Sequence, residues 1–156
     1  LPEKMKEEVG YLRKNVSDHR HAELSPEDMR DVFKATYVDV DKKFDVSECH
    51  FKQKDGIGAE VTIVADGKET VVDSHGNGRL NAVNHAIKKY FNLDYALDVY
   101  EEHSLSKRSD AQAISYVGIK PAGQEKLYWG AGTDDDIIKS SIDALVNAVN
   151  RYMENK

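Results

Sequence analysis

The sequence lacks a long hydrophobic run, a cluster of basic residues and a second cysteine. No stretch approaches the roughly 20 apolar residues of a transmembrane helix, so a membrane protein is not expected. The 22 Lys and Arg residues are scattered and the net charge is -6, so neither nucleic acid nor an anionic membrane is an expected partner. Cys49 stands alone, which excludes an internal disulfide and a thiolate metal site and fits a cytoplasmic, reducing setting.

Two short helices are predicted at the start of this 156-residue chain. Apolar residues recur there at steps of three and four, as on one face of an amphipathic helix: Met5, Val9, Leu12 and Val16. A second helix is expected to begin at Ser25-Pro26, because serine is a good N-cap and proline suits the first helical position. We therefore predict a helical linker subdomain over residues 1–36, formed as a hairpin.

From residue 37 the hydrophobic period changes to two, which indicates strands. β-branched residues gather in three runs, at 44–46, 61–64 and 70–72. Asp66-Gly67 separates the second run from the third and predicts a tight hairpin, because both positions tolerate positive φ. Gly76-Asn77-Gly78 then opens a segment with helical spacing. This order predicts a unit of three strands followed by a helix.

The same unit is predicted a second time. Further strand patterns occupy residues 95–99, 111–118 and 127–129, and a helical pattern runs from Ile138 to Tyr152. Gly130-Ala131-Gly132 precedes this helix, so we align it with Gly76-Asn77-Gly78, 54 residues earlier. The chain is therefore predicted to be an α+β protein in which two pseudo-symmetric βββα units form a domain over residues 37–156.

Gly76-Asn77-Gly78 is the strongest local candidate for a binding site. A glycine-rich turn before a helix lets free N–H groups approach an anion. It is also what a sharp turn needs, and both interpretations stay open. A nucleotide is not expected, since a third glycine and a Gly-Lys-Ser/Thr sequence are both missing.

We expect no catalytic residues and no metal ligands in this chain. Asp134-Asp135-Asp136 is interpreted as the cap of the last helix, although its carboxylates could also receive an ammonium group. His19 and His21 have no third ligand near them in the sequence. Glu101 and His103 share one strand face, but no nucleophile accompanies them.

Several motifs, in this order and spacing along nearly the whole chain, resemble the C-terminal part of the α-isopropylmalate synthases. The segment from Leu1-Pro2-Glu3 through the helix start at residues 24–29 resembles the second linker subdomain of that family. His75-Gly76-Asn77-Gly78-Arg79-Leu80-Asn81-Ala82 resembles its Gly-Asn-Gly-Pro regulatory loop. Further segments resemble the second repeat of that family: Tyr100-Glu101-Glu102-His103-Ser104, residues 109–113, and Trp129-Gly130-Ala131-Gly132 with residues 147–151.

The resemblance implies a regulatory domain that pairs two subunits as a homodimer and binds L-leucine, the end product of its pathway, as a feedback inhibitor. It implies that a catalytic (β/α)8 barrel, with the divalent metal of the acyl transfer, precedes residue 1, and the missing initial Met agrees with an excised fragment. No cofactor is implied within this segment. The positions implied to face leucine are Gly76, Gly78, Leu80, Asn81, Leu97, Tyr100, Ser104 and Ala111.

Two other functions fit the same sequence. A citramalate synthase has a regulatory domain of this fold that answers to isoleucine, and a structural dimerisation module would bind no ligand at all. The chain departs from the family at Arg79, where proline is usual. Arginine leaves the loop less restricted and adds a cation that could hold a carboxylate or point to solvent.

Overall fold

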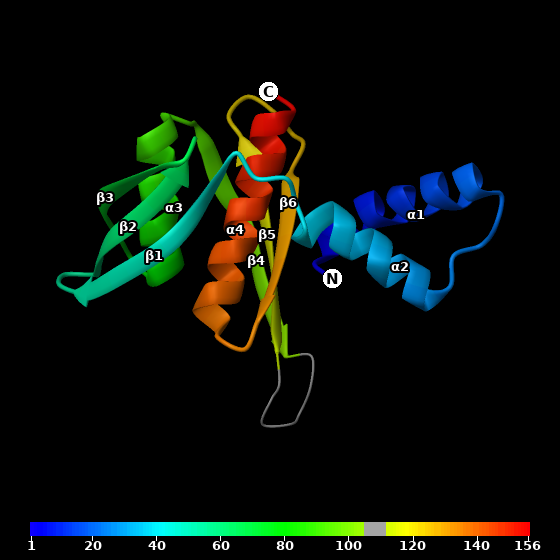
Figure 1. The fold of residues 1–156 in the computed structure, drawn as a ribbon, viewed down its shortest axis with the longest axis horizontal. Coiled ribbons are helices and arrows are strands. Elements are labelled where there is room, and N and C mark those ends of the chain that lie inside the picture. The colour runs from blue at the N-terminus through cyan, green and yellow to red at the C-terminus, as the bar shows by residue number, and fades with distance from the viewer. Residues whose placement is uncertain (105–111) are drawn as a thin grey trace.

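The computed structural model describes residues 1–104 and 112–156 (Figure 1). Its first part is helical: a short 3-10 turn η1 (Glu3–Met5), α1 (Lys6–Arg20), α2 (Pro26–Phe33) and a π-helical turn η2 (Lys34–Val38). Ser25 and Asp28 form a complete capping box at the start of α2, as the Ser25-Pro26 pattern indicated. The helical hairpin is confirmed, but helical structure continues to Val38 and includes Tyr37, which the sequence placed at the start of the strand region.

The first βββα unit consists of β1 (Phe44–Gln53), β2 (Ile57–Ala65), β3 (Lys68–Gly76) and α3 (Arg79–Phe91). The strands form an antiparallel sheet in the order β1-β2-β3. Asp66 and Gly67 both have positive φ, 52° and 72°, so the predicted hairpin turn is confirmed.

The second unit repeats this plan with β4 (Tyr95–Ser104), β5 (Ala113–Pro121), β6 (Tyr128–Asp134) and α4 (Ile137–Glu154). Its antiparallel sheet has the order β4-β5-β6. Both first strands begin with a buried aromatic residue, Phe44 or Tyr95, and both have a register shift around their fourth residue, Ser47 or Asp98. A bulge at the same place in each unit is independent support for the predicted pseudo-symmetry.

The alignment of the two Gly-x-Gly elements is wrong. Gly76 ends β3 and Gly78 is the N-cap of α3, whereas Gly130 and Gly132 both lie inside β6. The N-cap of α4 is Asp136, so the residue equivalent to Gly78 is an aspartate. The glycines of β6 have a packing role, because a Cβ on Gly130 would collide with the backbone of Ala144 and Ala148 in α4.

One main core spans both units. It contains the inward side chains of both sheets and the facing sides of α3 and α4, including Val61, Ile87, Ile119 and Leu145. In Figure 1, α3 covers one face of the first sheet and α4 lies between the two sheets. A smaller core on the other face of the second sheet joins Trp129 and Tyr116 to Met5 and Tyr37 of the helical segment. The second sheet is therefore covered on both faces.

Two buried asparagines of α4 hold the chain where it passes from the helices to β1. Asn150 accepts a hydrogen bond from the Lys43 amide at 2.7 Å and donates one to the Phe44 carbonyl at 3.0 Å. Asn147 donates to the Val38 carbonyl at 3.0 Å and to the Ala131 carbonyl of β6 at 2.8 Å. The end of the helical segment is thus fixed to α4 by side-chain amides that lie out of water.

Arg151 extends this attachment to α1. Its guanidinium donates to the Trp129 carbonyl at 2.8 Å, lies 4.6 Å from the centre of the Tyr37 ring and is 3.7 Å from the Glu8 carboxylate. Tyr37 donates its hydroxyl proton to Glu8 at 2.7 Å. Burial and the neighbouring Glu8 raise the pKa of Tyr37, so the hydroxyl stays a donor at neutral pH. Asn147, Asn150 and Arg151 are together called the α4 joint below.

The close contact of β6 with α4 predicts opposite effects for the same change at two glycines. Gly130→Ala should lower the free energy of unfolding by about 1–3 kcal/mol, because the new methyl group overpacks the helix contact. Gly10→Ala in α1, where a Cβ meets nothing within 4 Å, should raise it by roughly 0.5–1 kcal/mol. Urea unfolding of both variants checks the pair, and a neutral Gly130→Ala would contradict the packing role.

Candidate functional site

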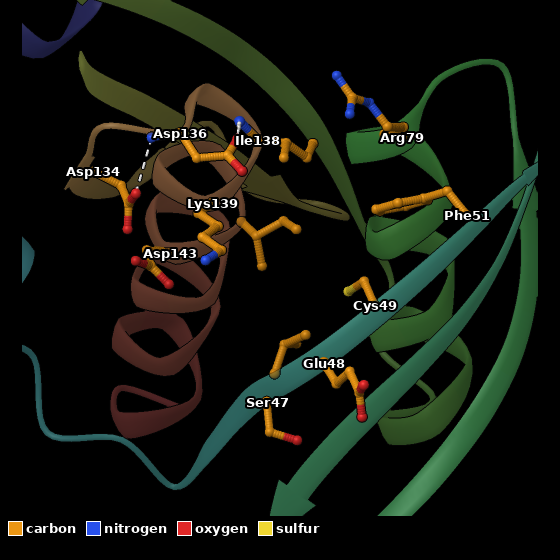
Figure 2. A pocket seen from close by; sticks show the side chains of 12 residues that line it. Ser47, Glu48, Cys49, Phe51, Arg79, Asp134, Asp136, Ile138, Lys139 and Asp143 are labelled. Carbon is orange, nitrogen blue, oxygen red and sulfur yellow. Dashed lines mark hydrogen bonds between the residues drawn. The ribbon is translucent and has the colours of Figure 1, made fainter. Parts of the chain in front are cut away.

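A cleft of about 440 Å³ lies between β1 and the first half of α4 (Figure 2). β1 and α4 are held together near Phe44 by Asn150 and enclose the cleft further along. The start of α3 contributes Arg79. The lining residues are Val46, Ser47, Glu48, Cys49, Phe51, Arg79, Asp134, Asp136, Ile138, Lys139, Ile142 and Asp143.

The β1 side of the cleft is an apolar wall created by the bulge. In a strand with regular alternation, Cys49 and Phe51 would point to the opposite face of the sheet from Val46. The register shift at Ser47 brings both side chains to the same face as Val46. Burial, with a smaller effect of Glu48, raises the pKa of the Cys49 thiol to about 11. The thiol is therefore protonated at neutral pH and acts as a small apolar group. Ile138 and Ile142 face this wall from α4.

Most carboxylates of the cleft have partners. Asp136 caps α4 by accepting from the Ile138 amide at 2.9 Å, and Asp134 accepts from the Asp136 amide at 2.9 Å. That backbone hydrogen bond is the main reason why the pKa of Asp134 is lowered. Glu48 pairs with His50 at 2.9 Å. The interpretation of residues 134–136 as a helix cap is therefore confirmed for Asp136.

Asp143 differs from these three carboxylates. It is half-buried, and within the described part of the chain no hydrogen bond or ion pair is found for its carboxylate. Burial is the main cause that raises its pKa; the nearby lysines lower this pKa, and the nearby aspartates raise it further. The cleft thus contains a half-buried carboxylate beside apolar side chains.

The glycine loop before α3 is closed by its own side chains. Asn81 accepts a hydrogen bond from the Asn77 amide at 3.0 Å, and a Cβ on Gly76 would lie 2.5 Å from the Asn81 side-chain oxygen. Gly78 has an extended backbone, and a Cβ there would meet nothing within 4 Å. A close backbone approach therefore accounts for Gly76. The ligand role of Gly76, Gly78 and Asn81 stays a prediction.

The other candidates lie in three environments. Leu80 and Leu97 pack on the main core. Tyr100 shares hydrogen bonds with Ser141 of α4 at 2.6 Å and with Glu102 at 2.5 Å, and Ser141 continues to the buried Ser115 at 3.1 Å. Ser104 is exposed at the end of β4, and Ala111 lies outside the described residues. These roles also stay predictions.

None of the seven described candidates lines the cleft, although Arg79, between Gly78 and Leu80, does. The apolar wall of the cleft could not be predicted from the sequence, because the bulge that builds it has no sequence pattern of its own. One signal for Asp143 was available: it is the only charged residue between Lys139 and Arg151 on a helix that is otherwise apolar or neutral there. A lone charge next to the apolar stripe of a helix marks a position to examine.

Across residues 1–104 and 112–156, no group of three or more His, Cys, Asp or Glu side chains is placed to bind a metal. The divalent metal that the resemblance implies therefore has no fitting donor set in this part of the chain. His19 and His21 are exposed, and His103 forms an exposed pair with Glu101 at 3.5 Å. No helix in the same residues is long and apolar enough to cross a membrane.

The amino-acid sequence of this chain is similar to those of known proteins. Residues 23–153 match the model of a family described as "LeuA allosteric (dimerisation) domain". The chain is 38% identical to a 2-isopropylmalate synthase of Desulfitobacterium hafniense, over 99% of the chain and 28% of that protein. It is 36% identical to the enzyme of that name from Helicobacter hepaticus, over 98% of the chain and 29% of the relative. The chain thus spans less than a third of the length of these relatives.

The N-cap of α4, Asp136, gives a prediction about the stability of the folded protein. Asp136→Ala should lower the free energy of unfolding by about 1 kcal/mol, because the Ile138 amide loses its acceptor. Asp136→Asn keeps a side-chain oxygen at the same place and should stay within a few tenths of a kcal/mol of the wild type. Thermal or urea unfolding measures both, and equal losses in the two variants would show that the carboxylate has another role.

Proposed function

Because this chain belongs to the LeuA allosteric (dimerisation) domain family, we propose that it is the leucine-sensing, dimer-forming regulatory part of a 2-isopropylmalate synthase. The family match over residues 23–153 is the observation that carries the proposal. The chain itself performs no chemistry in this proposal. The acyl transfer and its divalent metal belong to the portion of the relatives that this chain does not span.

The cleft between β1 and α4 supports a small amino acid as the ligand. Its apolar wall can cover an isobutyl group, which contributes about 1.5–3 kcal/mol when it is buried. Its charged groups can meet the ends of a zwitterion. Arg79 lines the cleft and directly follows Gly78 in the glycine loop. The proposed leucine site also includes the positions that the resemblance implies, namely Gly76, Gly78, Leu80, Asn81, Leu97, Tyr100, Ser104 and Ala111.

Leucine is preferred over isoleucine because the relatives named above are 2-isopropylmalate synthases, which does not favour the citramalate synthase alternative. The cleft alone gives a weaker argument. One methylene group in an apolar pocket discriminates by roughly 1–3 kcal/mol, so the shape of the wall formed by Val46, Cys49 and Phe51 must decide between the isomers.

Helix α4 offers a route from the cleft to the helical segment. Its first half lines the cleft through Ile138 to Asp143, and its second half carries the α4 joint. A ligand that favours one position of α4 therefore favours one position of α1 and α2. Coupling of this kind typically amounts to about 1–3 kcal/mol, which is enough for feedback control.

Ligand titration tests the sensing proposal. Leucine at about 100 times its dissociation constant should add about 2.7 kcal/mol to the free energy of unfolding, and the melting temperature should rise accordingly. Isoleucine and valine at equal concentration should raise it less. A larger shift with isoleucine would support the citramalate synthase alternative. Absence of any shift or heat with all three, on protein shown to be dimeric by sedimentation, would support a structural module.

Hydrogen exchange tests the route through α4. Leucine should slow amide exchange in residues 1–38 of the wild type, because the α4 joint transmits the ordering of the cleft. Arg151→Ala removes the contacts with Trp129, Tyr37 and Glu8 but leaves the cleft unchanged, so leucine should still bind while exchange in residues 1–38 no longer responds. Arg13→Ala, on the exposed surface of α1, is the control. An unchanged response in Arg151→Ala would rule out this route.

A further inference from the structure

The turn η2 joins the helical hairpin to the rest of the domain, and it is wider than an α-helical turn. The Asp39 amide donates to the Lys34 carbonyl, five residues back, at 2.8 Å. The Thr36 hydroxyl donates to the Val32 carbonyl at 2.8 Å, and side-chain bonds of this kind compete with the regular hydrogen bonds of a helix. A π-helical turn contains one residue more than an α-helical turn needs, and such turns are frequent at functional sites.

A slip of one residue in η2 would rotate α2 relative to the chain that follows the turn. One residue of an α-helix corresponds to about 100° of rotation and about 1.5 Å of rise. Among the five residues of η2, Tyr37 alone is buried, and it packs with Trp129 in the smaller core. Helices α1 and α2 have no buried residue, and Figure 1 shows them projecting from the side of the second sheet, away from the first. The hairpin can therefore turn while Tyr37 stays in place, and a contact that changes is that of Phe33 with the Tyr37 ring, 4.9 Å between ring centres.

Asn150 and Asn147 attach α4 to the two sides of this connection in different ways. Asn150 uses both halves of its side-chain amide, since it accepts from the Lys43 amide and donates to the Phe44 carbonyl. Asn147 uses only its nitrogen, which donates to the Val38 carbonyl at the end of η2. Its side-chain oxygen is buried, yet it has no hydrogen-bond partner among the residues that the structure describes. A buried acceptor without a partner opposes the conformation that leaves it unpaired. The attachment is therefore complete on the β1 side and incomplete on the η2 side.

From these observations we propose that η2 is a hinge with two hydrogen-bond registers. In the wide register of this structure, the Asp39 amide bonds to Lys34. In the narrow register its partner is Ala35, as in an α-helix, and α2 is rotated. Asn147 favours the wide register through its bond to Val38, whereas its unpaired oxygen opposes it, so the two registers differ little in free energy. The slip is a property of the ligand-free chain, so it goes beyond the proposed function and does not depend on leucine binding.

Relaxation dispersion by NMR on the ligand-free chain tests the hinge. The backbone amides of residues 26–39 should exchange on the microsecond-to-millisecond timescale with a second helical state populated at about 0.1–10%. The side-chain amide of Asn147 should report the same exchange rate, because its bond to Val38 differs between the registers, and that of Asn150 should report none. Absence of exchange in residues 26–39, a minor state with random-coil chemical shifts, or equal exchange at both asparagines would overturn the hinge.

Deletion of Ala35, which is exposed in η2, should abolish this exchange. Without the additional residue, the turn can close as an α-helical turn with α2 and Tyr37 in their present positions, and no second register is left. Deletion of Asp41, exposed in the connection between η2 and β1, shortens the chain by the same amount and should leave the exchange unchanged. Exchange that persists after deletion of Ala35 would have another origin than a register slip and would refute the proposal.

Variants of Thr36 test the hinge without a change in chain length. Thr36→Ala removes the side-chain bond to Val32 that competes with the α-helical register, so the population of the minor state should rise roughly two- to tenfold. Thr36→Ser keeps the hydroxyl and should match the wild type. An unchanged population in Thr36→Ala, or an equal rise in Thr36→Ser, would contradict the two-register hinge.

Discussion

The close approach of α4 to β6 is the contact on which the rest of the molecule depends. Gly130 and Gly132 remove two side chains from the strand, so the helix backbone rests directly on the sheet at Ala144 and Ala148. This position of α4 also fixes its distance from β1, and hence the width of the cleft. The same helix then reaches the N-terminal helices through Asn147, Asn150 and Arg151. Core, cleft and joint thus all depend on the position of one helix.

Local signals in the sequence were sufficient for most of the fold. Ser25-Pro26 and Asp66-Gly67 work through short-range hydrogen bonding and backbone preference, which act the same way in any context, and both were predicted correctly. The alignment of Gly76 with Gly130 failed because one residue type serves two purposes. Gly76 allows its backbone to approach Asn81, whereas Gly130 allows a helix to approach a strand. Only the tertiary structure distinguishes the two.

The cleft was harder to foresee than the fold for a similar reason. Its apolar wall depends on a single register shift at Ser47, which the composition of the strand does not reveal. The described candidates from the resemblance lie at the turn from β3 to α3, in α3 and on β4, and their ligand role is a prediction that rests on motif alignment. Asp143 carries no motif. It is recognised only in the tertiary structure, where the other carboxylates of the cleft, Asp134, Asp136 and Glu48, have hydrogen-bond or ion-pair partners.

The two bulges, Ser47 in β1 and Asp98 in β4, occupy the same place in the duplicated unit but have different surroundings. Ser47 borders the open cleft, whereas Asp98 forms an ion pair with Lys4 of the N-terminal segment at 3.1 Å. The two units thus contain the same structural irregularity in two different settings. One copy faces a space that a small molecule can enter, and the other is occupied by the chain itself.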